Sequence, residues 1–179
     1  ASAVGSYDRD VGAGDEAYTS VNLDNCTFKG SGTGYAFMPD RGAFRVEGCN
    51  ISNYEQAIYF ACDNYYTADC QIINNTISDC IYAIHGYYGG GSVETQPMVI
   101  RDNVISGKND RFAVIAILDQ SNNGTVKLDI ADNEFHYTIV GGINQRKDGD
   151  VAQGTMEKVL YANTLEDYSF VVDAYQYAD

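Results

Sequence analysis

The stretch Ile72-Ile73-Asn74-Asn75-Thr76-Ile77-Ser78 is one copy of a block that recurs along this chain of 179 residues. Apolar and polar positions alternate within the block, a short period that is typical of a β-strand rather than a helix. The anchor positions of the block, equivalent from copy to copy, are Cys26, Cys49, Asn75, Asn103, Asn133 and Asn163. A repeat of this kind is established first, because it constrains the whole architecture.

Three further columns of the repeat are almost wholly apolar. Two residues after the anchors stand Phe28, Ile51, Ile77, Ile105, Phe135 and Leu165. Three residues before them stand Leu23, Val46, Ile72, Ile100, Ile130 and Leu160. Five residues before them stand Val21, Phe44, Cys70, Met98 and Leu128, with Lys158 as the polar exception. A second apolar patch after each anchor, for example Ala83-Ile84, predicts one more strand per repeat.

Short strands and turns cannot bury an apolar face alone, so we expect the repeats to stack on one another. The pattern predicts an all-β, single-domain parallel β-helix of about six coils, each about 4.8 Å above the last. The anchor asparagines would then form a ladder of hydrogen-bonded side chains, continued by Cys26 and Cys49 as small fillers. Residues 1–19 lack the repeat and are interpreted as a cap or lead-in, and residues 20–179 as the β-helix.

The motif Asn-x-Ile-Ser followed by an apolar pair resembles the repeat of right-handed parallel β-helix proteins of the pectate-lyase-like superfamily. It is best preserved at Asn75-Thr76-Ile77-Ser78 and Asn103-Val104-Ile105-Ser106, and the resemblance covers about residues 20–175. It implies a right-handed coil. It does not imply one activity, because lyases, hydrolases, adhesins and phage fibres share this scaffold.

The enzyme motifs of that superfamily are missing from the sequence. Neither Pro39 nor Pro97 stands in the Arg-x-Pro-x-x-Arg context that the resemblance to pectate lyases implies. The pair of carboxylates that glycoside hydrolysis requires also has no clear candidate. We therefore favour a protein without catalytic activity.

Composition restricts the partners. A formal net charge of −14 argues against nucleic acid, whose phosphates need clustered Lys and Arg. No hydrophobic run is long enough for membrane insertion. The acidity and the 15 Tyr suggest a secreted or cell-surface protein.

The spacing between anchors grows along the chain, and the added residues lie mainly at 62–69, 86–96, 119–124 and 144–154. Insertions at one corner of a solenoid lie on one face, which is often the binding face. Aromatic and basic side chains in or beside them are candidates for binding a polysaccharide or other glycan: Tyr65, Tyr66, His85, Tyr87, Tyr88, Arg146 and Lys147. The alternative is that these tyrosines only shield the core. No cofactor is evident, and calcium is the candidate metal, with Asp148 and Asp150 as ligands.

A second corner precedes the Ala-Ile strand of each repeat. Lys108, Arg111 and His136 fall there on neighbouring repeats, and with Asp79 or Asp110 they would form an acid–base cluster. Charged residues on a solvated turn explain the pattern equally well.

Five cysteines are an odd number, so at least one is a thiol or pairs with another chain. Cys62 and Cys70 bracket a short segment that a disulfide would close. Cys26 and Cys49 would lie within disulfide range on stacked coils, or stay as buried thiols.

Our functional hypothesis from the sequence is an extracellular or cell-surface carbohydrate-binding or adhesion module. The first alternative is a domain of the polysaccharide lyase or glycoside hydrolase type. The second is a structural unit that assembles end to end, or joins other domains, through exposed coil ends.

Overall fold

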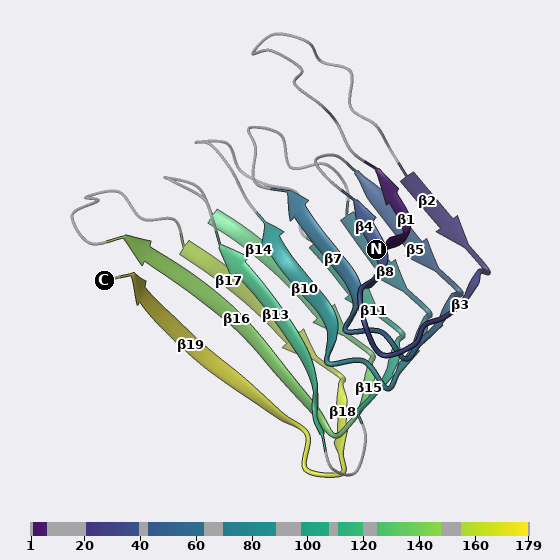
Figure 1. Cartoon of the computed structure of the whole chain (residues 1–179). Helices are drawn as coiled ribbons and strands as arrows, with labels where there is room; N and C mark the ends of the chain where they lie inside the picture. The colour runs from purple at the N-terminus through teal and green to yellow at the C-terminus, as the bar shows by residue number, and fades with distance from the viewer. Residues whose placement is uncertain are drawn as a thin grey trace, which may run out of the picture.

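A computed structural model describes residues 2–6, 21–39, 43–62, 70–88, 98–107, 111–119, 125–147 and 155–178. The described chain is a parallel β-solenoid in which strands from successive repeats lie side by side (Figure 1). This confirms the predicted all-β fold class. No helix occurs among these residues.

Three parallel sheets form the walls of the solenoid. Sheet A contains, in spatial order, β1 (Ser2–Ser6), β4 (Tyr35–Pro39), β7 (Gln56–Cys62), β10 (Tyr82–Tyr88), β13 (Ala113–Asp119), β16 (Thr138–Lys147) and β19 (Phe170–Ala178). Sheet B contains β2 (Val21–Asp24), β5 (Phe44–Glu47), β8 (Cys70–Ile73), β11 (Met98–Arg101), β14 (Thr125–Ala131) and β17 (Thr155–Tyr161). Sheet C contains β3 (Thr27–Lys29), β6 (Asn50–Ser52), β9 (Thr76–Ser78), β12 (Val104–Ser106), β15 (Glu134–His136) and β18 (Thr164–Glu166).

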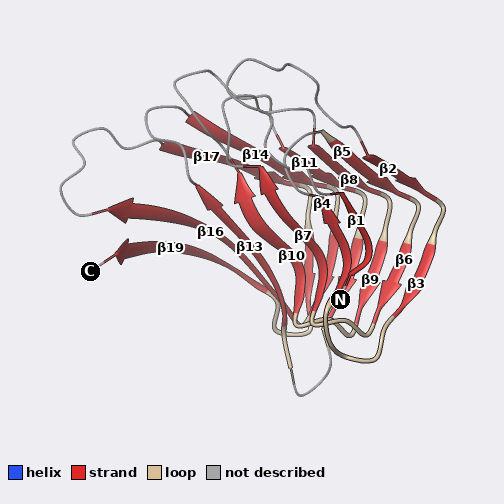
Figure 2. Cartoon of the chain, turned by 45° about the horizontal axis from the view of Figure 1, so that its top comes forward, coloured by secondary structure: helices blue, strands red, loops and turns tan. Residues whose placement is uncertain are grey.

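The chain visits sheets B, C and A in turn, so every strand pairs with the strand three elements away (Figure 2). β1, which comes from the segment interpreted as a lead-in, pairs with β4 and extends sheet A. The rest of that segment, residues 7–20, lies outside the described residues.

The apolar columns of the sequence stack in register inside the solenoid. In sheet C, Ile77 aligns with Ile51 on one side and with Ile105 on the other. Sheet A adds Ile58 and Ile84, which also align with each other. All five side chains are essentially inaccessible to solvent. The core is therefore a set of ladders of like residues running along the solenoid.

A left-handed backbone conformation makes the turn between sheets B and C. The residue directly before each anchor has a positive φ: Asn25, Gly48, Asn74, Asp102, Asp132 and Ala162. Asn, Asp and Gly tolerate this region better than other residues do, because of their short polar side chain or missing Cβ. The pairs Asn74-Asn75 and Asp102-Asn103 thus combine a turn former with an anchor.

The buried anchors form the hydrogen-bonded ladder. Asn75 donates from its backbone N and from Nδ2 to Oδ1 of Asn103, with both distances 3.0 Å. Asn103 makes the same pair of bonds to Asn133, and Asn133 to Asn163. At the other end, the backbone N of Cys49 donates to Asn75 Oδ1 at 2.9 Å. Each turn therefore has its buried amide N–H satisfied by the anchor of the following coil.

Two cysteines continue the anchor ladder as thiols. Cys26 and Cys49 are stacked, and the backbone N of Cys26 lies 3.4 Å from Sγ of Cys49. Burial is the largest cause of a raised pKa of the Cys49 thiol. Cys70 is buried, and its side chain belongs to an apolar column of the core. The side chain of Cys62 lies outside the described residues, so the suggested disulfide between Cys62 and Cys70 stays a prediction.

Candidate functional site

The outer faces of sheets B and C are polar. Sheet B presents ion pairs, including Arg101 with Asp129 at 2.7 Å across neighbouring strands. Sheet C presents short side chains at its outward positions, such as Thr27, Asn50 and Thr76, which align in register. Faces of this kind need no partner to remain in water.

The outer face of sheet A carries four neighbouring rings, which we call the aromatic strip: Tyr35 on β4, Tyr59 on β7, and Tyr82 and His85 on β10. The ring centres of Tyr35 and Tyr59 are 5.4 Å apart, and those of Tyr59 and His85 are 5.5 Å apart. Tyr82 stacks on His85 at 4.7 Å. All four side chains are half-buried. The strip thus crosses three adjacent strands and exposes part of each ring.

Local sequence explains why these rings face outward. In a strand, successive side chains point to opposite faces. Tyr59 and His85 each follow an inward-facing isoleucine, Ile58 and Ile84 respectively. Their strands pair in register, so Tyr59 and His85 are direct neighbours across β7 and β10. The same outward-facing position of sheet A therefore carries a ring on two successive coils, Tyr59 on β7 and His85 on β10.

His85 makes a polar contact with Gln56, which lies beside the strip on β7. Its Nδ1 lies 2.9 Å from Oε1 of Gln56. With that oxygen as acceptor, the ring carries its proton on Nδ1. Burial lowers the pKa of His85 below the ordinary value of 6.5, so the ring is uncharged at neutral pH. The strip and the neighbouring Gln56 therefore offer flat apolar faces, phenol groups and a primary amide, and the histidine of the strip carries no charge at neutral pH.

His85 is the sequence candidate that lies in the strip, and four other candidates belong to strands of the same sheet. Tyr87 and Tyr88 follow His85 on β10, and Arg146 and Lys147 end β16, which lies two strands away in the same sheet. The backbone of these four residues is described but their side chains are not. The remaining candidates, Tyr65, Tyr66, Asp148 and Asp150, lie outside the described residues.

The four insertions inferred from the sequence share a position in the topology. They follow or include the last residues of β7, β10, β13 and β16. Since all four strands belong to sheet A and run parallel, their carboxyl ends lie on the same side of that sheet, at the ends of the strands. The aromatic strip lies on the sheet from which these insertions leave.

Sequence reasoning missed Tyr35, Tyr59 and Tyr82. It searched the insertions, whereas these rings lie within the repeat itself. The available signal was the recurrence of a ring directly beside the Ala-apolar pair, as in Tyr35-Ala36-Phe37 and Tyr82-Ala83-Ile84.

The second corner contains two separate features. Asp79 and Arg111 line a small cleft of about 170 Å³ together with Gly32, Asn53, Tyr54, Cys80 and Ile81. His136 does not line that cleft. Lys108 and Asp110 lie outside the described residues.

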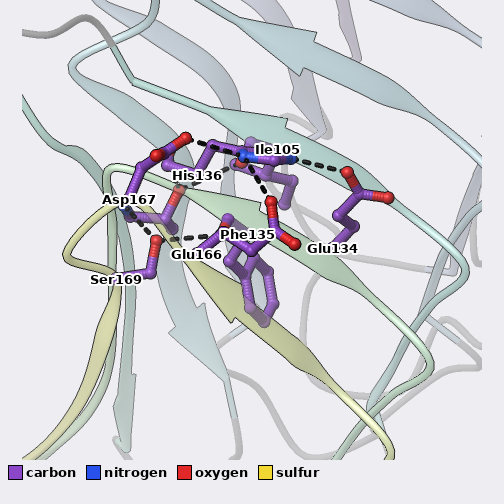
Figure 3. Close-up of polar contacts among 8 residues, drawn as sticks. Ile105, Glu134, Phe135, His136, Glu166, Asp167 and Ser169 are labelled. Atoms are coloured by element: carbon purple, nitrogen blue, oxygen red, sulfur yellow. Dashed lines mark hydrogen bonds and ion pairs between the residues drawn. The ribbon is translucent and has the colours of Figure 1, made fainter.

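His136 lies instead among three carboxylates, as Figure 3 shows. Its Nε2 is 2.6 Å from Glu134, and its Nδ1 is 3.1 Å from Asp167 and 3.6 Å from Glu166. Hydrogen bonds to Glu134 and Asp167 are the largest causes of the raised pKa of His136.

Glu134, His136 and Glu166 are the described residues that could gather around a metal ion, since one ligand atom of each lies within 4.8 Å of the others. Both ring nitrogens of His136 already contact carboxylate oxygens. We assign no metal to this cluster.

Comparisons of the chain with protein-family models, with curated proteins and with solved structures found no match. The right-handed coil and the pectate-lyase-like family therefore stay predictions. Within the described residues, no helix is long and apolar enough to span a membrane.

Proposed function

We propose that this protein is an extracellular or cell-surface module that binds a glycan on the outer face of sheet A, without catalysing a reaction. The observation that carries the proposal is the aromatic strip of Tyr35, Tyr59, Tyr82 and His85. Such rings form a surface with an apolar body and a polar edge, which is the combination that a sugar ring also presents.

The geometry of the strip supports an extended ligand. Its rings come from adjacent strands, which in a parallel sheet are about 4.8 Å apart. A sugar chain running along the solenoid axis would therefore meet one row of side chains after another. Gln56 and the tyrosine hydroxyls supply hydrogen bonds for the sugar hydroxyls.

Charge supports a neutral ligand over an anionic one. The chain has a formal net charge of −14, and that field would repel an acidic polymer. His85 adds no compensating positive charge at neutral pH, because burial lowers its pKa.

Binding should depend on Tyr59, which lies between Tyr35 and His85 in the strip. We expect Tyr59→Ala to weaken binding by about tenfold, equivalent to about 1.4 kcal/mol, because the ligand loses a central stacking surface. Isothermal titration calorimetry would measure this loss on a neutral polysaccharide first identified with a glycan array.

Tyr168→Ala is the matched control, since Tyr168 is 82% exposed but lies at the corner before β19, away from the strip. It should bind as the wild type does. Equal losses in both variants, or none in Tyr59→Ala, would refute the proposed face.

The same array, run with and without calcium and followed by an assay for unsaturated or reducing-end products, separates the alternatives. Product formation would replace this proposal with a lyase or hydrolase. An absence of both binding and products would favour a structural unit that associates through its ends.

A further inference from the structure

The His136 cluster joins two neighbouring coils of the solenoid. Glu134 and His136 belong to β15, whereas Glu166 ends β18 and Asp167 begins the following turn. β15 and β18 pair in register, with His136 opposite Glu166. The histidine contacts are thus the charged part of the connection between these two strands.

The positions of the ring nitrogens determine which protonation state fits the site. A neutral imidazole has one N–H donor and one acceptor nitrogen, whereas the imidazolium ion has two donors. Nε2 of His136 faces an oxygen of Glu134 at 2.6 Å, and Nδ1 faces an oxygen of Asp167 at 3.1 Å. A neutral ring would direct a nitrogen lone pair at one of these carboxylates, so the doubly protonated ring is the form that satisfies both contacts.

Neutral hydrogen bonds hold the same turn. The backbone N of Thr138 donates to Oγ of Ser169 at 3.0 Å, and that hydroxyl donates to the carbonyl of Phe135 at 3.0 Å (Figure 3). These bonds do not change with pH near neutrality. Among the described contacts of this turn, those of the histidine are the ones that respond to protons in that range.

We propose that His136 is a pH-dependent clamp, which in its doubly protonated form holds the turn after β18 against β15 and on deprotonation loosens it. Loss of the proton leaves Glu134, Glu166 and Asp167 around an uncharged ring. Mutual repulsion of the three carboxylates then favours separation of the two coils at this corner.

The groups facing the ring come from three directions. Glu134 is on the same strand, and Glu166 and Asp167 come from the following coil. From the preceding coil, β12 aligns the uncharged Ser106 with His136. Among the described residues, the charges that face the ring are therefore the three carboxylates, and all of them favour its protonated form.

The sign of the pH effect follows from linkage. Hydrogen bonds to Glu134 and Asp167 raise the pKa of His136 above the ordinary value of 6.5. A group with a higher pKa in the folded state stabilises the fold fully below its unfolded pKa, and that stabilisation is lost as the pH rises through the folded pKa. The clamp is accordingly closed below pH 6.5 and opens as the pH rises through the higher pKa that His136 has in the folded state.

NMR titration of the histidine side chains tests the clamp directly. The chain has only two histidines, so His136→Gln identifies both sets of ring signals. In the presence of EDTA, the His136 midpoint should lie above 6.5 and that of His85, whose pKa is lowered by burial, below it. Glu134→Gln and Asp167→Asn should each lower the His136 midpoint, whereas Glu47→Gln, which alters a partly exposed carboxylate of sheet B paired with Arg45, should not.

Hydrogen exchange tests the structural consequence. The amide of Ser169 donates to Glu166 within the clamped turn, and that of Thr164 donates to Asn133 on the coil before it. After correction for the intrinsic pH dependence of exchange, the protection of these two amides should fall across the His136 titration in the wild type. It should show no such step in Glu134→Gln with Asp167→Asn.

A His136 midpoint at or below 6.5 would overturn the proposal, and so would protection that does not change across the titration. The wild-type measurements decide the matter even if a variant fails to fold. Neither result depends on glycan binding.

Discussion

Asn103 illustrates how much one side chain contributes in this fold. Its Oδ1 accepts hydrogen bonds from the backbone N and from Nδ2 of Asn75. Its own Nδ2 donates to the carbonyl of Ile72 and to Oδ1 of Asn133, both at 2.9 Å. The side chain is only 1% exposed, so water does not replace any of these partners.

Replacing Asn103 with alanine should therefore be costly. The change leaves the buried amide N–H of Asn75 without an acceptor, and each buried group that loses its partner costs about 1–3 kcal/mol. We expect Asn103→Ala to reduce the free energy of unfolding by at least about 2 kcal/mol in urea denaturation.

Asn50→Ala provides the comparison, because Asn50 is exposed on the outer face of sheet C. Its effect should stay within about 0.5 kcal/mol. Equal effects of the two substitutions would mean that the ladder contributes no more to stability than a surface asparagine.

At the scale of the strands, Gly86 allows β7 and β10 to pack closely in sheet A. Gly86 of β10 lies opposite Phe60 of β7. A Cβ at Gly86 would lie 2.2 Å from the carbonyl oxygen of Phe60 and 2.8 Å from its ring. Neither atom can move without disturbing a paired strand, so Phe60 occupies space that the missing side chain leaves.

Gly86→Ala should consequently destabilise the protein by about 1–3 kcal/mol, the usual cost of overpacking a core. Thermal or urea unfolding would measure the change against Thr76→Ala, an exposed position of β9. A neutral Gly86→Ala would indicate that β7 and β10 can separate slightly at this point without cost.

The strands could be predicted from the sequence because burial constrains every inward column. Ile51, Ile77 and Ile105 recur at the same distance from their anchors, and the repeat makes that regularity visible. Outward positions carry no such constraint. Tyr59 and His85 became neighbours only through the register of β7 and β10, which the repeat spacing does not specify by itself.

The His136 cluster shows that outward side chains at the corners are equally hard to predict from the repeat. The sequence predicts that His136 lies at the second corner, with Asp79 or Asp110 of earlier coils as its carboxylate partner. Its carboxylates come from its own strand and from the following coil. The turns beside the ring contain left-handed residues of different types, Tyr137 and Asp167. The repeat therefore does not indicate which carboxylates reach the ring.

For the whole molecule, the exposure of one apolar column changes along the solenoid. Ile105 is completely buried in β12, whereas Leu165, the equivalent residue of β18, is 46% exposed. The two side chains have the same number of carbon atoms. Replacing each with alanine therefore compares the effect of burial and not of side-chain size.

Ile105→Ala should cost about 2–5 kcal/mol, as is usual for a large aliphatic residue in a core. Leu165→Ala should cost clearly less, because its side chain already contacts solvent. Chemical denaturation at several protein concentrations would measure both. An equal cost for Leu165→Ala, growing with concentration, would show that a second copy covers this side chain in solution.

The anchor ladder also bears on how such a chain can change in evolution. From one anchor to the next, the donor is always the earlier residue and the acceptor is always Oδ1 of the asparagine that follows, so the anchor-to-anchor bonds all run in one direction. A tandem duplication from one anchor to the next would insert one more asparagine into the ladder. That asparagine would accept from the anchor before it and donate to the anchor after it, so the ladder would remain continuous. A deletion of one whole copy would do the same. Gain or loss of an entire repeat is therefore easier to tolerate than the loss of a single anchor.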